Sequence, residues 1–209
     1  MSRLLLLRHG QSTWNAEHRW QGWADPPLSP LGERQAGAAA RWLATWSERF
    51  AAAVVSSDLV RARRTAEVLA EGLGLGPVEV DADLRERDVG DWTGLTTGEI
   101  GSRWPAVLAE WRAGRLVATP GGEPEPALVA RVLAGLSRLA ARHGAGEAVL
   151  VITHGGAIRA LERRFGIEPN PLGLGNLCGR WIEFDGPDPR AGPAVTLPAL
   201  DEDTVAIFR

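Results

Sequence analysis

The sequence LLLLRHG occupies residues 4–10 and decides the fold expected for this chain. A short unbroken apolar run is typical of a strand buried on both faces, as in a parallel sheet covered by helices. Similar runs occur at residues 53–56 and 148–153, and a shorter one occurs at 78–80. These segments predict four strands, of which 78–80 is an edge or minor strand.

Helical patterns separate the predicted strands. The pair Ser29-Pro30 has the residue types of an N-cap and a first helical position, and apolar residues at helical spacing follow it. A second helix is expected through 62–73 with Asp58 as its cap, and two more are expected at 129–139 and 157–165. This alternation predicts an α/β fold, a three-layer sandwich with a mostly parallel central sheet and right-handed crossovers.

The remaining segments are less regular. Residues 95–125 are expected to form a cap-like insertion over one end of the sheet, with short helical pieces at 97–103 and 105–113. The tail is expected to hold two weaker strands joined by a proline- and glycine-rich loop, namely strands 181–184 and 204–208 and loop 186–193. A length of 209 residues suits one domain, so residues 1–209 are expected to form a single domain.

Composition excludes several classes of function. All 23 basic residues are arginine, and the chain has no lysine and no tyrosine. Lysine Schiff-base chemistry and a Walker A phosphate site are therefore excluded, and arginine is left to bind anions. The net charge of −3 gives no reason to expect nucleic acid or an anionic membrane as a partner.

The chain also lacks the signals of membrane, secreted and zinc proteins. No segment approaches the roughly 20 apolar residues of a membrane span, and the first apolar run is too short for a signal peptide. The single Cys178 cannot form an internal disulfide, which fits a cytoplasmic protein. One cysteine and four scattered histidines give no metal-site spacing, so no metal is expected.

Polar residues follow each strong predicted strand, where open parallel sheets bind their ligands. Arg8 and His9 follow the first strand, Arg61 lies just beyond the second, and His154-Gly155-Gly156 follows the third and opens a helix. A helix N-terminus adds backbone N–H donors and the positive end of a dipole. The sequence therefore predicts an anion site with two histidines and at least two arginines.

A phosphate held by arginine and histidine favours histidine as the nucleophile. A neutral imidazole can attack phosphorus while arginines neutralise the charge that develops on the oxygens. The leaving oxygen then needs a proton from a nearby carboxylic acid. Glu86 is the candidate, although Asp88 competes with it, and Glu86 can also be read as a solvated carboxylate paired with Arg85 or Arg87.

The sequence around these residues resembles the histidine phosphatase superfamily, which has the phosphoglycerate-mutase-like fold. The matching blocks occur in family order and cover nearly all of residues 4–184. They are 7–15, 19–25, 28–32, 56–62 with 65–66, 84–86 with 90–94, and 154–156.

The resemblance implies a division of labour within the site. His9 would be the residue phosphorylated during turnover, and Glu86 would be the acid and then the base. Arg8, Arg61 and His154 would bind the transferring phosphoryl group. The substrate or phosphate pocket would also include Asn15, Gln21, Gly22 and Gly155. No metal and no cofactor is needed for this chemistry.

Three functions remain open, in descending order of preference. The first is a phosphomonoester hydrolase acting on a small phosphorylated metabolite, such as a sugar phosphate or a phosphoglycerate derivative. The second is a cofactor-dependent phosphoglycerate mutase, disfavoured because the interval from Glu86 to His154 is only 68 residues (154 minus 86) and offers few basic residues. The third is a non-catalytic phospho-ligand-binding module. Dimers are common in similar proteins, so a homodimer is compatible with the resemblance.

Two further expectations concern the loops. Phosphatases of this branch commonly read Gly-Gly-Glu-Ser before the third helix, whereas this chain has Pro124 in the last position. Proline removes a hydroxyl and an N–H, so an altered helix N-cap is expected there. The tryptophans of the first long loop, including Trp23, are expected to pack that loop rather than to bind substrate.

Overall fold

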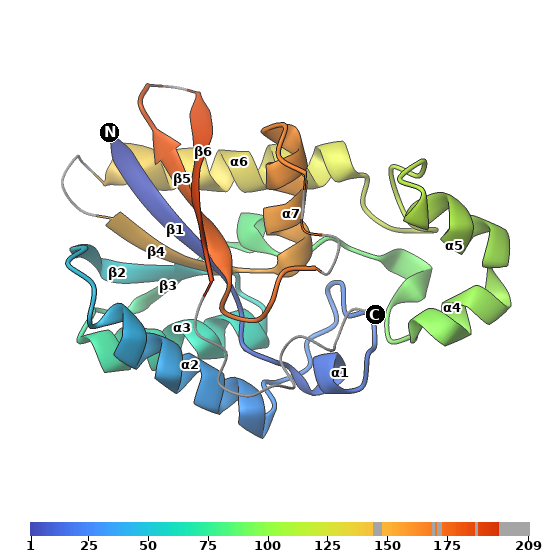
Figure 1. The fold of residues 1–209 in the computed structure, drawn as a ribbon, viewed down its shortest axis with the longest axis horizontal. Coiled ribbons are helices and arrows are strands. Elements are labelled where there is room, and N and C mark those ends of the chain that lie inside the picture. The colour runs from blue at the N-terminus through green and yellow to red at the C-terminus, as the bar shows by residue number, and fades with distance from the viewer. Residues whose placement is uncertain (144–147, 169, 171–172, 187, 197–209) are drawn as a thin grey trace.

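A computed structural model describes residues 1–143, 148–168, 170, 173–186 and 188–196. Its described strands form one six-stranded sheet in the order β3-β2-β4-β1-β5-β6 (Figure 1). The strands are β1 Ser2–Arg8, β2 Phe50–Ser56, β3 Val78–Val80, β4 Ala148–Thr153, β5 Gly179–Phe184 and β6 Pro189–Val195.

The four strands predicted from the first apolar runs are confirmed, and they are parallel to one another. β5 and β6 add an antiparallel edge to this parallel core. In the register, Arg8 pairs with Thr153, and Ser56 pairs with Ile152. The ends of β1, β2 and β4 therefore meet at one edge of the sheet.

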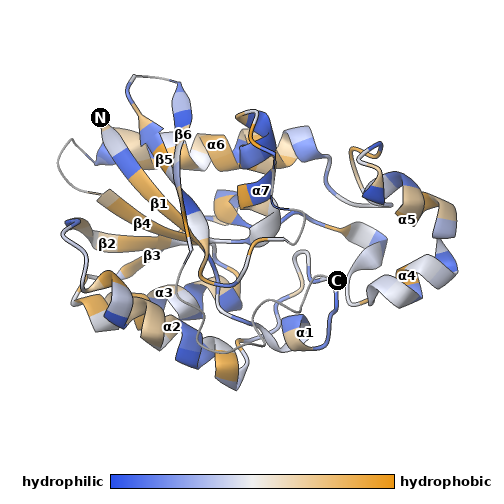
Figure 2. Cartoon of the chain, in the orientation of Figure 1, coloured by the Kyte–Doolittle hydropathy of each residue, from blue (hydrophilic) through white to orange (hydrophobic). Residues whose placement is uncertain are grey.

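Helices cover both faces of the sheet, which confirms the three-layer α/β fold (Figure 1). Leu4 and Leu6 pack with α6 Glu125–Arg142 and α7 Gly155–Arg164. Leu5 and Leu7 pack with α2 Pro30–Leu43 and α3 Val60–Leu73 on the other face. Because side chains alternate along a strand, four consecutive leucines supply both cores. Figure 2 shows the central strands as mainly apolar.

The helix termini follow the sequence with one exception. The Ser29 hydroxyl accepts a hydrogen bond from the Gly32 N–H at 3.1 Å, as an N-cap should. Asp58 was expected to cap α3, but this expectation is wrong: its carboxylate binds Arg85 at 2.5 and 2.8 Å. Asp25, from the first loop, accepts the Val60 N–H at 2.6 Å instead. Two charge-assisted hydrogen bonds from the Arg85 guanidinium hold the Asp58 carboxylate more strongly than one backbone N–H of the helix would.

The insertion contains α4 Thr97–Arg103 and α5 Pro105–Arg112, close to the predicted pieces. It has its own small apolar core, in which Trp92, Ile100 and Leu108 pack with the half-buried Trp20 of the first loop. Two short 3₁₀ turns, Ala82–Leu84 and Gly90–Trp92, and the four-residue α1 Thr13–Ala16 complete the described helices. In Figure 1, α4 and α5 extend beyond the carboxyl edge of the sheet.

Pro124 is the N-cap of α6 and makes no capping hydrogen bond through its side chain, as expected for proline. The Glu125 N–H donates to the Val117 carbonyl at 2.8 Å instead. This bond ties the start of α6 to the insertion.

The loop expected at 186–193 is partly wrong, because β6 occupies Pro189–Val195. β6 is the edge strand of the described sheet. Proline is tolerated in an edge strand, where one side of the backbone needs no partner, so the composition that suggests a loop also suits this strand. The strand predicted at 204–208 lies outside the described residues. Within the described part of the chain, no helix has the length and apolar character to cross a membrane.

Candidate active site

Two histidines meet where β1 and β4 end. His9 follows Arg8, His154 follows Thr153, and these strand residues are register partners. The imidazole centroids are 5.1 Å apart with an angle of 64° between the planes. His9 is 2% exposed and His154 is fully buried. Adjacent strands are about 4.8 Å apart, so the sheet itself sets this separation.

The hydrogen bonds of His9 define its tautomer. Its Nδ1 lies 2.6 Å from the Gly10 carbonyl, which can only accept. The Arg61 Nε–H, which can only donate, points at Nε2 from 3.3 Å. Nδ1 therefore carries the proton, and Nε2 presents a lone pair toward the site. A neutral imidazole in this tautomer is ready to act as a nucleophile.

Arg61 is anchored by the first loop. Its two terminal nitrogens donate to the carbonyls of Ala24 and Gly22 at 2.8 and 2.9 Å. Gly22 has a φ of 49°, in the left-handed region that favours glycine. A Cβ there would also lie 2.9 Å from the Val89 side chain. With both terminal nitrogens fixed, the Nε–H of Arg61 is directed at His9.

Arg8 is the second buried arginine beside His9. Its guanidinium donates to the carbonyl of Leu174. Gly155, the first residue of α7, packs against this side chain, since a Cβ on Gly155 would lie 3.3 Å from the Arg8 Cδ. Burial lowers the pKa of both Arg8 and Arg61 from 12.5 to about 10. Both guanidinium groups therefore stay charged at neutral pH.

The two histidines are held neutral. Burial, followed by the neighbouring cation of Arg61, holds the pKa of each imidazole well below 6.5, and Arg8 adds to the effect. Neither ring nitrogen of His154 has a hydrogen-bond partner within the described residues. A buried polar atom without a partner is costly, and a bound anion would supply one. Arg61 thus contacts the Nε2 of His9, and Arg8 and the unpartnered His154 lie close to the same imidazole.

Glu86 reaches the same site from the segment after β3. Its carboxylate accepts the Arg87 N–H at 2.7 Å and the Gly156 N–H, at the start of α7, at 3.0 Å. A Cβ on Gly156 would lie 2.2 Å from the nearer carboxylate oxygen, so a larger residue there would displace the Glu86 carboxylate. The alternative of a solvated Glu86 paired with Arg85 or Arg87 is not what the structure shows.

The possible partners of Glu86 and its competitor Asp88 are engaged elsewhere. Arg85 binds Asp58, and Arg87 binds Glu125. The carboxylate of Asp88 accepts the Gly90 N–H at 3.0 Å within its own turn. Glu86, by contrast, contacts the start of α7, two residues after His154.

Asn15 and Gln21 lie together at the first loop. The Ser12 N–H donates to the Asn15 side-chain oxygen at 3.2 Å, and the Ser12 hydroxyl donates to the Gln21 side-chain oxygen at 2.7 Å. Thr65 fixes the neighbouring backbone, because its hydroxyl accepts the Gly10 N–H at 3.1 Å. Ser12 thus links the two amide side chains directly after the Arg8-His9-Gly10 turn.

Sequence reasoning misses Arg131, which clamps the segment that carries Glu86. Arg131 lies on α6 and donates to the carbonyls of Asp83, Arg85 and Glu86 at 2.7 to 2.9 Å. Its guanidinium also forms a bidentate pair with Glu123 at 2.7 and 2.8 Å. The available signal was an arginine three residues after Leu128, on the apolar face of the helix.

Two more residues were missed or misread. Trp23, expected to pack the first loop, is 42% exposed, and its indole N–H donates to the Glu86 carbonyl at 2.7 Å. Its ring lies under the guanidinium groups of Arg85 and Arg131, so it holds the first loop against the segment of Glu86 rather than entering an apolar core. Asn176 donates to the His9 carbonyl at 2.9 Å. Contacts to backbone carbonyls leave no pattern in a sequence.

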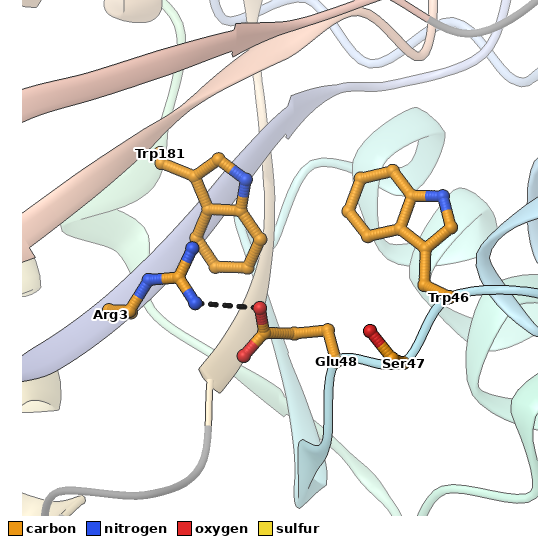
Figure 3. A pocket seen from close by; sticks show the side chains of 5 residues that line it. All are labelled: Arg3, Trp46, Ser47, Glu48 and Trp181. Carbon is orange, nitrogen blue, oxygen red and sulfur yellow. Dashed lines mark hydrogen bonds and ion pairs between the residues drawn. The ribbon is translucent and has the colours of Figure 1, made fainter.

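A hollow elsewhere on the surface is distinct from this site (Figure 3). It has a volume of about 310 Å³ and is lined by Arg3, Trp46, Ser47, Glu48 and Trp181. Arg3 lies at the amino end of β1, five residues or roughly 17 Å from Arg8 at 3.3 Å per residue. Figure 3 shows Arg3 stacked beside Trp181 and paired with Glu48.

Comparisons with known proteins agree with this geometry. A model of the histidine phosphatase superfamily (branch 1) matches residues 4–191. The chain belongs to the histidine phosphatase superfamily. It is accordingly an enzyme of the phosphatase or phosphotransfer type. Among the described residues of this superfamily member, no three His, Cys, Asp or Glu side chains gather as metal ligands would.

Similar proteins include both mutases and phosphatases. A 2,3-bisphosphoglycerate-dependent phosphoglycerate mutase of Methylorubrum extorquens is 42% identical over 166 residues, which are 77% of this chain and 78% of the mutase. A mycobacterial glucosyl-3-phosphoglycerate phosphatase solved with VO3 superposes with a TM-score of 0.80 and 35% identity, over 95% of this chain and 100% of that one. Bacillus stearothermophilus YhfR superposes with a TM-score of 0.79 and 30% identity, over the whole of both chains.

Proposed function

We propose that this protein is a metal-independent phosphomonoester hydrolase that acts on a small phosphorylated metabolite through a phosphohistidine at His9. One observation carries the proposal. A neutral His9 lies beside the buried cations of Arg8 and Arg61 and the unpartnered His154. This arrangement combines a nucleophile with the donors that a phosphoryl group requires.

In the first step, the His9 Nε2 attacks phosphorus, and the ester P–O bond breaks as the N–P bond forms. Arg61 exchanges its 3.3 Å hydrogen bond to Nε2 for one to a phosphoryl oxygen. Arg8 and His154 bind the other oxygens. The leaving oxygen takes a proton from Glu86, which becomes a carboxylate.

In the second step, water attacks phosphorus. Glu86 removes a proton from this water, the N–P bond breaks, and inorganic phosphate leaves with the water oxygen. His9 and Glu86 return to their starting protonation states. Water thus replaces the leaving alcohol on the same side of the site, so one carboxyl group serves both steps.

The proposal is tested with the phosphoenzyme. The wild-type protein should release phosphate from p-nitrophenyl phosphate, form an acid-labile phosphoenzyme, and remain active in excess chelator. His9→Ala should abolish both turnover and labelling. Glu86→Gln should slow the hydrolysis of alkyl phosphates by about 10²–10⁴-fold and affect the activated nitrophenyl ester less. Labelling that persists in His9→Ala would refute the nucleophile.

A phosphoglycerate mutase is the second candidate, favoured by the 42% identity to the Methylorubrum mutase. The arginines of the insertion argue against it. Arg103, Arg112 and Arg115 are all exposed, and Arg115 pairs with Glu110 at 2.6 Å. Conversion of 2- to 3-phosphoglycerate with and without bisphosphoglycerate separates the two functions. Isomer formed faster than inorganic phosphate would establish the mutase.

A further inference from the structure

Arg159 lies beside the active site and has no part in the steps above. It follows Gly155 by four residues and Gly156 by three on α7. Helical side chains lean toward the helix N-terminus and cover the residues three and four positions earlier. The Arg159 side chain therefore extends over the turn whose backbone contacts Arg8 and Glu86.

Arg159 has no partner among the residues that the structure describes. Its Nε is buried and makes no hydrogen bond, and its guanidinium forms no ion pair there. Its neighbours on α7 are paired: Arg163 binds Glu125 at 2.5 and 2.8 Å, and Glu162 binds Arg180 at 3.0 Å. Buried guanidinium donors normally have acceptors, and the described residues supply none for the Arg159 Nε, so this guanidinium is open to an acceptor.

The surroundings of Arg159 favour an anionic acceptor. Burial and the cations of Arg163 and Arg87 lower the pKa of the Arg159 guanidinium, while Glu86 and Glu162 oppose this shift. Arg87 and Arg163 already share the carboxylate of Glu125. Arg159 is thus a half-buried cation in a positively charged region, next to the carboxyl group that protonates the leaving oxygen.

We propose that Arg159 binds a second anionic group of the substrate, a carboxylate or a second phosphate carried by the leaving alcohol. This inference rests on the hydrolase proposed above. Arg8, Arg61 and His154 hold the transferring phosphoryl group, and Glu86 faces the ester oxygen. An anion at Arg159 therefore belongs to the leaving group, close to that oxygen. The substrate class is a small phosphomonoester with a second negative charge near the ester bond.

The test compares esters that differ in one group. The first pair tests a carboxylate: 3-phosphoglycerate has a carboxylate where glycerol 3-phosphate has a hydroxymethyl group. The second pair tests a second phosphate: 1,3-propanediol bisphosphate has a phosphate where 3-hydroxypropyl phosphate has a hydroxyl group. The wild-type enzyme should have a higher kcat/KM for the anionic member of one pair. Arg159→Gln should lower that selectivity ratio by about 10- to 100-fold, as expected on loss of a charge-assisted hydrogen-bonded pair, and Arg159→Lys should restore part of it.

Arg164→Ala is the matched control, because it removes an exposed arginine from the same helix and should leave the ratio unchanged. A wild-type enzyme with no preference for either anionic ester would overturn the inference. So would an Arg159→Gln variant that loses kcat/KM equally for both members of a pair. Phosphate release from none of the esters, nor from p-nitrophenyl phosphate, would instead refute the hydrolase itself, and the anion site with it.

Discussion

Replacing Arg131 with methionine should impair the acid Glu86 without touching the phosphoryl group. The substitution keeps the aliphatic stem but removes three hydrogen bonds to the carbonyls of residues 83, 85 and 86. It also leaves Glu123, whose side chain is 13% exposed, without its bidentate partner. Breaking a buried pair costs about 3–5 kcal/mol, so a large fall in the free energy of unfolding is expected.

The catalytic effect should depend on the leaving group. A misplacement of about 1 Å costs roughly 10²-fold in rate, and acid catalysis as a whole contributes about 10²–10⁴-fold. We therefore expect Arg131→Met to lower kcat about 10²-fold for an alkyl phosphate. The loss should be much smaller for p-nitrophenyl phosphate, whose leaving group needs no proton. The assay is phosphate release across esters of graded leaving-group pKa.

Two control variants separate positioning from stability. Arg138→Met removes a 53% exposed arginine from the same helix. Because surface ion pairs contribute about 0–1 kcal/mol, this variant should change neither the free energy of unfolding nor the leaving-group dependence of kcat by much. Glu123→Gln keeps Arg131 on the carbonyls, so it should lower stability more than it alters the leaving-group dependence. Equal rate losses for both kinds of ester in Arg131→Met would refute the positioning argument.

Three other predictions follow from the same geometry. Gly156→Ala should displace Glu86, because the new Cβ would lie 2.2 Å from its carboxylate; an alkyl phosphatase rate within twofold of wild type would contradict this. Below pH 6.5 His9 and His154 become protonated in the unfolded chain, whereas the folded protein keeps both neutral. The free energy of unfolding should therefore decrease as the pH is lowered below 6.5, by about 1.4 kcal/mol per pH unit for each histidine. Urea melts at pH 7 and 5.5 measure this fall, and His154→Asn should reduce it. Arg61→Lys should make kcat/KM decline with rising pH above neutrality, because burial lowers the pKa of a lysine that starts below that of arginine, whereas a flat profile there would show that the lysine stays charged.

Much of the fold follows from residues 4–10 and the runs that resemble them. A strand such as β1, buried on both faces, belongs in the interior of a sheet covered by helices, and the residues after it are expected at the ligand-binding edge. His9 and His154 therefore become neighbours although 145 residues (154 minus 9) separate them in the sequence. The apolar runs place both histidines at one edge of the sheet, and the pairing of β1 with β4 makes them neighbours.

The parts that sequence reasoning misses depend on competition between partners. Asp58 has the residue type of a helix cap, yet Arg85 takes its carboxylate and Asp25 replaces it at the helix. Arg131 contacts carbonyls 45 to 48 residues away in the sequence, which any residue type could offer. Such outcomes depend on which groups the folded chain brings within reach, and no local pattern encodes them.

The absence of lysine has a physical consequence inside the site. Burial brings the pKa of Arg61 from 12.5 to about 10, which leaves it charged throughout the neutral range. An unperturbed lysine has a pKa of about 10.4, and the same burial would lower it further, so its charge would be less secure at this position than that of arginine. Arg61 also uses three nitrogens in three directions, toward His9, Gly22 and Ala24. A lysine ammonium, a single point on a flexible stem, cannot hold the first loop and face the nucleophile at once. Position 61 therefore requires arginine for its geometry, independently of the high arginine content of the chain.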